Sequence, residues 1–303
     1  MIDIMDKKKW YFAFSGLIII PGIIALIIWG LNLGIDFTGG TLVELSFQNK
    51  INKTSLETAI EKNNLEVASI APTDAGTYLI RTKPLNDNQR KTILETAKKE
   101  FGTILEVSHE TIGPTIGAEL LRKALIALAV ASVAIVFYIA WAFRSVPKPA
   151  SSWRFGVSAV VARLHDAFLV VGVFAILGHF LAVEIDSLFA TALLTIIGFS
   201  VHDTIVVFDR VRENLKKGVG ENFASVVNHS VMQTIARSLN TSITVVFVLL
   251  AVLLFGGASL RWFTVALLVG IIAGTYSSIF TASPLLVVWQ EWSDRRSKIK
   301  SPN

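Results

Sequence analysis

The sequence predicts a polytopic α-helical membrane protein with six transmembrane helices and an external α+β ferredoxin-like domain between the first and second helices. Three observations support this prediction. The 303 residues are 52% hydrophobic and have a mean hydropathy of +0.59, which is typical of membrane chains rather than soluble ones. Six apolar runs are long enough to cross a bilayer. The stretch 34–117, between the first two runs, is instead charged and mostly polar.

The first apolar run extends from Trp10 to about Gly30, directly after Lys7, Lys8 and Lys9. A basic flank before an apolar run also occurs in secretory signals, but this run is longer than a typical signal core and no A-x-A cleavage site follows it. The sequence therefore predicts that residues 1–33 form a cytoplasmic N-terminus and an uncleaved first transmembrane helix.

The external domain is predicted at 34–117 because its elements follow the order β-α-β-β-α-β, which is the ferredoxin-like pattern. Alternating residues indicate strands, and periods near 3.6 indicate helices. Thr54 is a plausible N-cap for the first helix, with Glu57 completing a capping box. The predicted strands are 41–47, 67–71, 77–82 and 103–110, and the predicted helices are 54–63 and 86–101.

Residues 118–290 are predicted to hold transmembrane helices two to six. Between the fourth and fifth runs, the segment of about 210–238 has apolar residues at helical spacing and a basic start, which predicts a cytoplasmic amphipathic segment that could lie on the membrane surface. Residues 291–303 form a basic cytoplasmic tail. The apolar runs that remain are 120–143, 155–177, 188–208, 239–255 and 261–289.

The formal net charge of +5 is explained by topology, because membrane proteins concentrate Lys and Arg in their cytoplasmic loops. Here the basic residues cluster at both termini and in the loops after the second and fourth spans, whereas the short opposite loops carry only Arg261 at an edge. Both termini are therefore predicted in the cytoplasm and the domain outside. No nucleic-acid-binding motif is present, so nucleic acid is not an expected partner. The absence of cysteine excludes disulfides and thiolate metal sites.

Ionisable residues inside the apolar runs are the first candidates for function, because a charge within a spanning helix costs several kcal/mol. Asp203 lies in the fourth run beside His202. His165 and Asp166 lie in the third run, and Arg163 precedes them and could neutralise Asp166 internally.

The two His-Asp dipeptides also raise the alternative of an intramembrane metalloenzyme, since such ligands can bind zinc. Neither dipeptide has H-E-x-x-H spacing, and the other histidines, at 109, 179 and 229, fall outside the predicted spans. The sequence therefore predicts no metal site and argues against the metalloenzyme alternative.

Three segments resemble one known family. They are GIDFTGGT at 34–41, LTIIGFSVHDTIVVFDRVREN at 194–214 and RSLNT at 237–241. Together with the six-span layout, they resemble the SecF family, which are the smaller subunits of the bacterial SecD–SecF accessory complex of the Sec translocon, in the resistance–nodulation–division superfamily.

The resemblance implies a multi-pass protein of the bacterial cytoplasmic (inner) membrane that forms a complex with SecD and acts beside SecYEG. The implied activity is use of the proton-motive force to promote late translocation of unfolded preproteins. Protons would be the coupling ion, with no cofactor. YajC-like and SecA components are further candidate partners, and the lipid bilayer surrounds the helices.

The resemblance also suggests roles for individual residues. Asp203 matches the carboxylate of the family's Asn-Asp-Thr motif and is the expected proton carrier. Arg237 matches the family's cation and is the expected counter-ion, unless the two form a permanent structural ion pair. His202 stands where the family usually has Asn, so it either relays protons or hydrogen-bonds as Asn would. Thr204 is expected to bond to a neighbouring helix or to its own backbone.

Two further groups have open roles. His165 and Asp166 are similar to a His-Asp pair of the family and belong either to the proton pathway or to helix packing. Gly34, Asp36, Gly39 and Gly40 are expected to shape the junction between the first span and the domain, or to touch substrate. A non-transporting scaffold that holds SecD and translocon subunits together is the competing function.

Overall fold

The computed structural model describes residues 3–49, 51–73, 76–144, 146–147 and 151–300. The chain forms two compact units. The first unit contains Met1–Leu31, Ala127–His179 and Thr191–Asn303, and the second contains Asn32–Ile126 together with Phe180–Ala190. The last three residues of the predicted basic tail, 301–303, lie outside the described residues.

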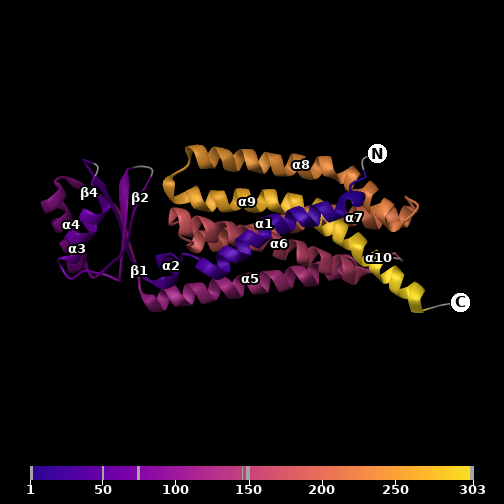
Figure 1. Cartoon of the computed structure of the whole chain (residues 1–303), viewed down its shortest axis with the longest axis horizontal. Coiled ribbons are helices and arrows are strands. Elements are labelled where there is room, and N and C mark those ends of the chain that lie inside the picture. Colours follow the sequence, from indigo (N-terminus) through magenta and orange to yellow (C-terminus); the bar gives the residue numbers. More distant parts are fainter. Residues whose placement is uncertain (1–2, 50, 74–75, 145, 148–150, 301–303) are drawn as a thin grey trace. The chain divides into compact units, whose positions relative to one another are not determined.

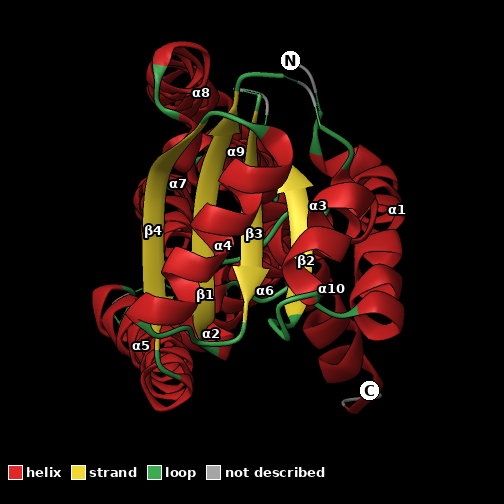
Figure 2. Ribbon diagram, turned by 90° about the vertical axis from the view of Figure 1, so that its left-hand side faces the viewer, coloured by secondary structure: helices red, strands yellow, loops and turns green. Residues whose placement is uncertain are grey.

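The second unit has the predicted ferredoxin-like topology. Its sheet has the strand order β2-β3-β1-β4 with antiparallel neighbours, and Figure 2 shows two helices across one face of it. Val43, Leu45 and Ile80 of the sheet are fully buried with Leu56 and Ile93 of these helices. The elements are β1 (Gly40–Phe47), α3 (Lys53–Glu61), β2 (Val67–Pro72), β3 (Thr77–Thr82), α4 (Asp87–Phe101) and β4 (Ile104–Ile112).

The N-cap of α3 differs from the predicted one. Asn52 is the cap, and its side chain accepts a 2.9 Å hydrogen bond from the N–H of Thr54. The main chain is still extended at Asn52 and already helical at Thr54, so Asn52 is the side chain placed to accept from the first turn. The capping box lies in the other helix, where Asn86 and Gln89 bond reciprocally at the start of α4.

Six helical segments in the described residues are long and apolar enough to cross a membrane, which confirms the predicted multi-pass architecture. The described residues of the first unit begin and end at the same end of its helices (Figure 1), as an even number of spans requires. The helices are α1 (Lys8–Trp29), α5 (Pro114–Ala142), α6 (Ser152–Leu181), α7 (Ser187–Lys217), α8 (Phe223–Phe255) and, as parts of one sixth segment, α9 (Arg261–Ser277) and α10 (Ser283–Lys300).

The range 210–238, predicted as an amphipathic segment that could lie on the membrane surface, consists of the end of α7, a short connection at 218–222 and the start of α8. α7 continues to Lys217, and α8 runs unbroken from Phe223 for 33 residues. No Gly or Pro interrupts α8. Ser and Thr side chains within it donate to carbonyls of their own helix one turn back, as Thr241 does to Arg237. The helix therefore continues directly into the predicted fifth span.

A π-helical turn, Ser278–Ala282, joins α9 to α10. Such turns are rare, contain an i→i+5 bond and occur frequently at functional sites. Ser278 and Ser283 within this region are both fully buried. The sixth span is also the most enclosed, with 67% of its apolar window buried against 6% for α5 and 11% for α8. The sixth span is therefore central, whereas α5 and α8 are left to face lipid or a partner.

Candidate functional site

Asp203 lies inside the first unit, on α7, and is 1% exposed. Its Oδ2 accepts a 3.4 Å hydrogen bond from Ser242 Oγ of α8, and Ser242 in turn accepts a 2.6 Å bond from Thr275 Oγ1 of α9. Nδ1 of His202 lies 3.5 Å from the other carboxylate oxygen. The carboxylate is thus held by hydroxyl groups of two neighbouring helices and by the histidine beside it.

Asp166 forms a second buried carboxylate site, on α6, and is also 1% exposed. Its Oδ2 accepts from Ser200 Oγ of α7 at 2.6 Å and from Ser277 Oγ of α9 at 2.8 Å. Nδ1 of His165 lies 3.0 Å from Oδ1. The ring of the same histidine lies against Tyr276 of α9, with centroids 6.3 Å apart.

Thr204 connects α7 to the π-helical turn. Its Oγ1 lies 2.9 Å from Ser278 Oγ and also bonds to the carbonyl of Ser200, one turn back on α7. Both contacts anticipated for this residue, to a neighbouring helix and to its own backbone, are therefore present.

The close packing of α9 against α7 depends on two glycines of α9. A Cβ at Gly270 would lie 2.3 Å from the side chain of Ile196, and one at Gly274 would lie 3.0 Å from Cβ of Ser200. The G-x-x-x-G spacing permits this approach. Because of it, Ser277 and Ser278, in the next turn of the chain, reach Asp166 and Thr204.

Arg237 does not form the expected ion pair with Asp203 in the part of the chain that the structure describes. Its side chain is exposed on α8, and the ion pairs among the described residues do not include one between Arg237 and Asp203. Among the residues that the structure describes, Arg163 is the Lys or Arg side chain that is buried, at 6% exposed, and its Nη1 donates to the carbonyl of Ala159. The role of Arg237 as counter-ion stays a prediction.

The predicted junction residues gather in the second unit. Gly34 follows α1 and precedes the one-turn helix α2 (Ile35–Thr38), and its N–H donates to the carbonyl of Ile185 at 2.8 Å. A Cβ at Gly34 would lie 2.9 Å from that oxygen. Gly39 has φ +72° and lies against Pro114, while Gly40 has φ +145° and lies against the carbonyl of Thr82. Glycine is required at these three positions by close backbone approach.

Asp36 of α2 accepts a 2.7 Å hydrogen bond at Oδ2 from the N–H of Ser187, the first residue of α7. Asp186 accepts from the N–H of Phe189 at 2.9 Å. Burial raises the pKa of Asp186; the bond from Phe189 opposes this shift, and the charge of Asp36 adds to it. Two carboxylates therefore share the N-terminus of α7.

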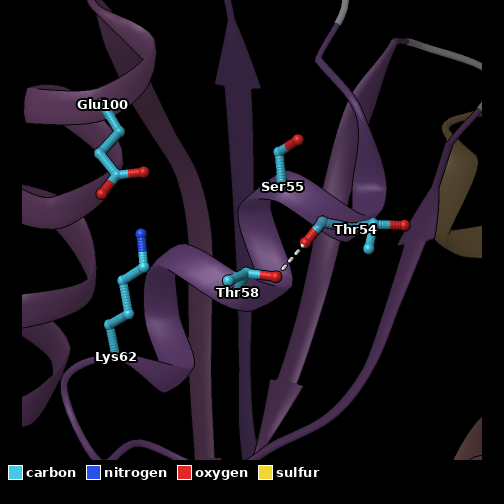
Figure 3. A pocket seen from close by; sticks show the side chains of 5 residues that line it. All are labelled: Thr54, Ser55, Thr58, Lys62 and Glu100. Atoms are coloured by element: carbon cyan, nitrogen blue, oxygen red, sulfur yellow. Dashed lines mark hydrogen bonds between the residues drawn. The ribbon is translucent and has the colours of Figure 1, made fainter.

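A shallow hollow of about 280 Å³ lies between α3 and α4, lined by Thr54, Ser55, Thr58, Lys62 and Glu100. Figure 3 shows the Lys62 amine and the Glu100 carboxylate facing each other across it. Its residues are small or charged surface groups, and none of them is buried. Nothing in this hollow resembles the enclosed carboxylate sites of the helices.

No group of three or more His, Asp or Glu side chains suited to a metal ion occurs in the part of the chain that the structure describes. The functional candidates that sequence reasoning missed are hydroxyl residues: Ser200, Ser242, Thr275, Ser277 and Ser278. Their only signal in the sequence is the density of Ser and Thr within apolar runs, and that density does not say which of them face a carboxylate.

This fold and these sites define a class, namely a multi-pass membrane protein with carboxylates enclosed by its spanning helices and with a small α+β domain. Two family models match the chain. "Protein export membrane protein SecD/SecF, C-terminal" covers residues 92–292, and the "SecD/SecF GG Motif" covers residues 24–51. The chain belongs to the SecF family of protein translocase subunits.

The similar proteins agree with this assignment. Protein translocase subunit SecF of Thermobaculum terrenum is 45% identical, over 96% of this chain and 94% of its own length. Protein translocase subunit SecDF of Bacillus subtilis is 36% identical over 98% of this chain. The crystal structure of SecDF from Thermus thermophilus aligns with a TM-score of 0.85 and 34% identity over 96% of this chain. The chain spans 39% of the length of each of these two SecDF chains.

Proposed function

We propose that this protein is an accessory subunit of the Sec protein-export machinery that works with SecD and uses the proton-motive force to promote late translocation of preproteins through SecYEG. The observation that carries the proposal is the carboxylate of Asp203, 1% exposed within a spanning helix and held by neutral hydroxyls rather than by a fixed cation. A carboxylate in such surroundings can gain or lose a proton without breaking a permanent ion pair.

The proton step follows from these contacts. Ser242 donates to the ionised carboxylate of Asp203, and protonation removes the charge that this hydroxyl stabilises. The loss of that charge changes the preferred packing of α7 against α8 and α9. Proton flow drives such a change only if the two packing arrangements bind the proton with different affinity. His202, whose side chain is 57% exposed, is the candidate group for passing protons to Asp203.

The exposed polar face of α8 supports a partner within the membrane. Arg237, Asn240 and Thr244 lie at helical spacing, and all three are exposed. An arginine on a spanning helix is costly in lipid and ordinarily faces a protein acceptor. We assign this face to SecD, because relatives such as that of Bacillus subtilis are named as single SecDF chains.

The proposed setting is the bacterial inner membrane, with both termini in the cytoplasm and the ferredoxin-like domain outside. This orientation rests on the positive-inside rule and on the basic residues after α5 and at the end of α7. Unfolded preprotein is the proposed substrate of the assembly, protons are its coupling ion, and SecYEG, SecA and a YajC-like protein are its proposed neighbours.

The test is the substitution Asp203→Asn, measured as export of a Sec substrate by inverted vesicles with and without a proton-motive force. Asp209→Asn is the matched control, because Asp209 lies on the same helix but is 53% exposed. Assembly is checked by co-purification of SecD. Loss of only the energised part of export with the Asp203 variant supports the proposal, whereas unchanged export with an intact complex supports a scaffold instead.

A further inference from the structure

The connection between α6 and α7 is bonded through its main chain to the segment that follows the first span. The N–H of Gly34 donates to the carbonyl of Ile185, and the N–H of Ile185 donates to the carbonyl of Asn32, both at 2.8 Å. Leu33 and Ile185 thereby form a parallel β-bridge. Ile185 is 5% exposed, so the Ile185 side of this bridge is shielded from water.

Side chains strengthen the same contact. Arg81 of β3 forms an ion pair with Glu184 and donates from Nη1 to the carbonyl of Leu33 at 3.2 Å. A strand of the ferredoxin-like sheet is therefore connected to Leu33 of the bridge and to Glu184, the residue before Ile185. All of these residues belong to the second unit, together with Asp36.

Asp36 connects this region directly to α7. The helix already has its own cap, since Asp186 accepts from Phe189. Asp36, from a distant part of the sequence, accepts from the N–H of Ser187 at 2.7 Å. A carboxylate at a helix N-terminus is stabilised by the free N–H groups and by the helix dipole. The same helix carries Asp203 about 24 Å further along, at the rise of an α-helix.

We propose that Asp36 is a positioning residue that connects α7 to the base of the external domain, and that the Leu33–Ile185 bridge stays closed throughout the transport cycle. This inference rests on the proposed function. According to this inference, the N-terminus of α7 and the base of the domain move together. A shift of α7 caused by protonation of Asp203 is therefore passed to the domain through the N-terminus of α7.

The contacts favour a permanent connection over one that opens in each cycle. Opening would break two main-chain bonds at buried or half-buried residues, the bond to Asp36 and an ion pair. Backbone groups without partners are costly away from water. Gly34 has no side chain that could replace the lost contact, and its backbone lies so close to Ile185 that a Cβ would be 2.9 Å from the carbonyl oxygen.

The chain contains no cysteine, so the double substitution Leu33→Cys with Ile185→Cys introduces a single possible disulfide across the bridge. We expect the oxidised complex to keep the energised part of export at the level of the reduced complex. We also expect the disulfide to form equally well with and without a proton-motive force. Each single cysteine variant, oxidised in the same way, is the control. A loss of export on oxidation that a reductant restores would overturn the proposal.

A second measurement tests Asp36 itself. Asp36→Ala removes the acceptor for the Ser187 N–H, and we expect a loss of about fivefold in the energised part of export, with the remaining export unchanged. Asp36→Asn keeps an acceptor oxygen and is expected to retain most activity. Glu95→Ala, at an exposed carboxylate of α4 in the same domain, is the control. An Asp36→Ala variant that behaves like this control overturns the proposal.

Running Asp203→Asn beside these variants separates the two hypotheses. If Asp203→Asn loses energised export and Asp36→Ala does not, the proposed function stands and the positioning role of Asp36 falls. If Asp36→Ala loses energised export and Asp203→Asn does not, the connection stands and the assignment of Asp203 as proton carrier falls.

Discussion

Ser200 of α7 donates a 2.6 Å hydrogen bond to Oδ2 of Asp166 of α6, and so joins two spanning helices through one buried carboxylate. The same oxygen accepts from Ser277 of α9 at 2.8 Å. Three helices therefore meet at Asp166, close to the turn of α7 that carries Thr204 and Asp203. We therefore expect Asp166 to stabilise the packing of α6 against α7 and α9.

Ser200→Ala and Ser277→Ala are each expected to lower the free energy of unfolding by about 1–3 kcal/mol, because a buried carboxylate loses a donor. The measurement is the thermal unfolding midpoint of the purified protein in detergent. Ser132→Ala is the control, since Ser132 is exposed on α5 and bonds only to its own helix. Equal midpoints for all three variants would show that the hydroxyls contribute nothing to stability.

Gly270→Ala is expected to destabilise the bundle by about 1–3 kcal/mol through overpacking, because the new Cβ would meet three side-chain atoms of Ile196 within 2.7 Å. Ile196→Ala removes those atoms. The double variant should therefore be more stable than the sum of the two single effects predicts. Gly198→Ala is the control, since a Cβ there meets nothing within 4 Å. Strict additivity would contradict the close contact of α9 with α7.

Asp186→Asn is expected to stabilise the protein at neutral pH and to lose that advantage in acid. The pKa of Asp186 is raised in the folded state, mainly by burial, so its ionised form is disfavoured there. Ionisation of Asp186 therefore lowers the free energy of unfolding at pH values above the pKa of the folded state. This loss of stability disappears when the pH falls below the pKa of Asp186 in the unfolded chain. Asn keeps the acceptor for Phe189. Thermal midpoints at pH 7 and pH 3 test this, with a difference of about 2 °C expected at pH 7 and none at pH 3.

Asn52→Ala is expected to increase amide exchange in the first turn of α3, because it removes a helix cap of about 1 kcal/mol. Thr54→Ala should have little effect there, since the Thr54 side chain does not cap the helix. Hydrogen exchange of the full-length protein distinguishes the two. A larger effect of Thr54→Ala would support the cap position predicted from the sequence instead.

The sequence predicts the number of spans and the order of the external strands and helices because apolar length and residue period are local properties. The α3 cap was placed wrongly because Asn52 and Thr54 both have suitable side chains, and only the backbone conformation decides between them. The length of α8 was missed because its first turns are amphipathic, which is also typical of a surface segment.

Asp203 could be singled out from the sequence because an isolated carboxylate in an apolar run is unusual. Its partners could not. Ser242 and Thr275 are ordinary residues for membrane helices, where hydroxyls commonly bond to their own backbone, and their meeting with Asp203 depends on how three helices pack. The pairing of Asp203 with Arg237 was proposed from the resemblance, and the exposed position of Arg237 in the single chain leaves it a prediction.

The unbroken length of α8 has a consequence for what lies beyond the lipid. Its 33 residues span about 50 Å, whereas the hydrocarbon core of a bilayer is about 30 Å thick. α7 is nearly as long, and Asn214 near its end bonds to Ser230 of α8 at 2.8 Å. The N-terminal segment also bonds here, through Ile4 N–H to Asn228. The hydrocarbon core of a bilayer therefore covers only part of α8 if the helix crosses along the membrane normal, and the bonds from Asn214 and Ile4 hold the remaining N-terminal turns of α8 to α7 and to the start of the chain.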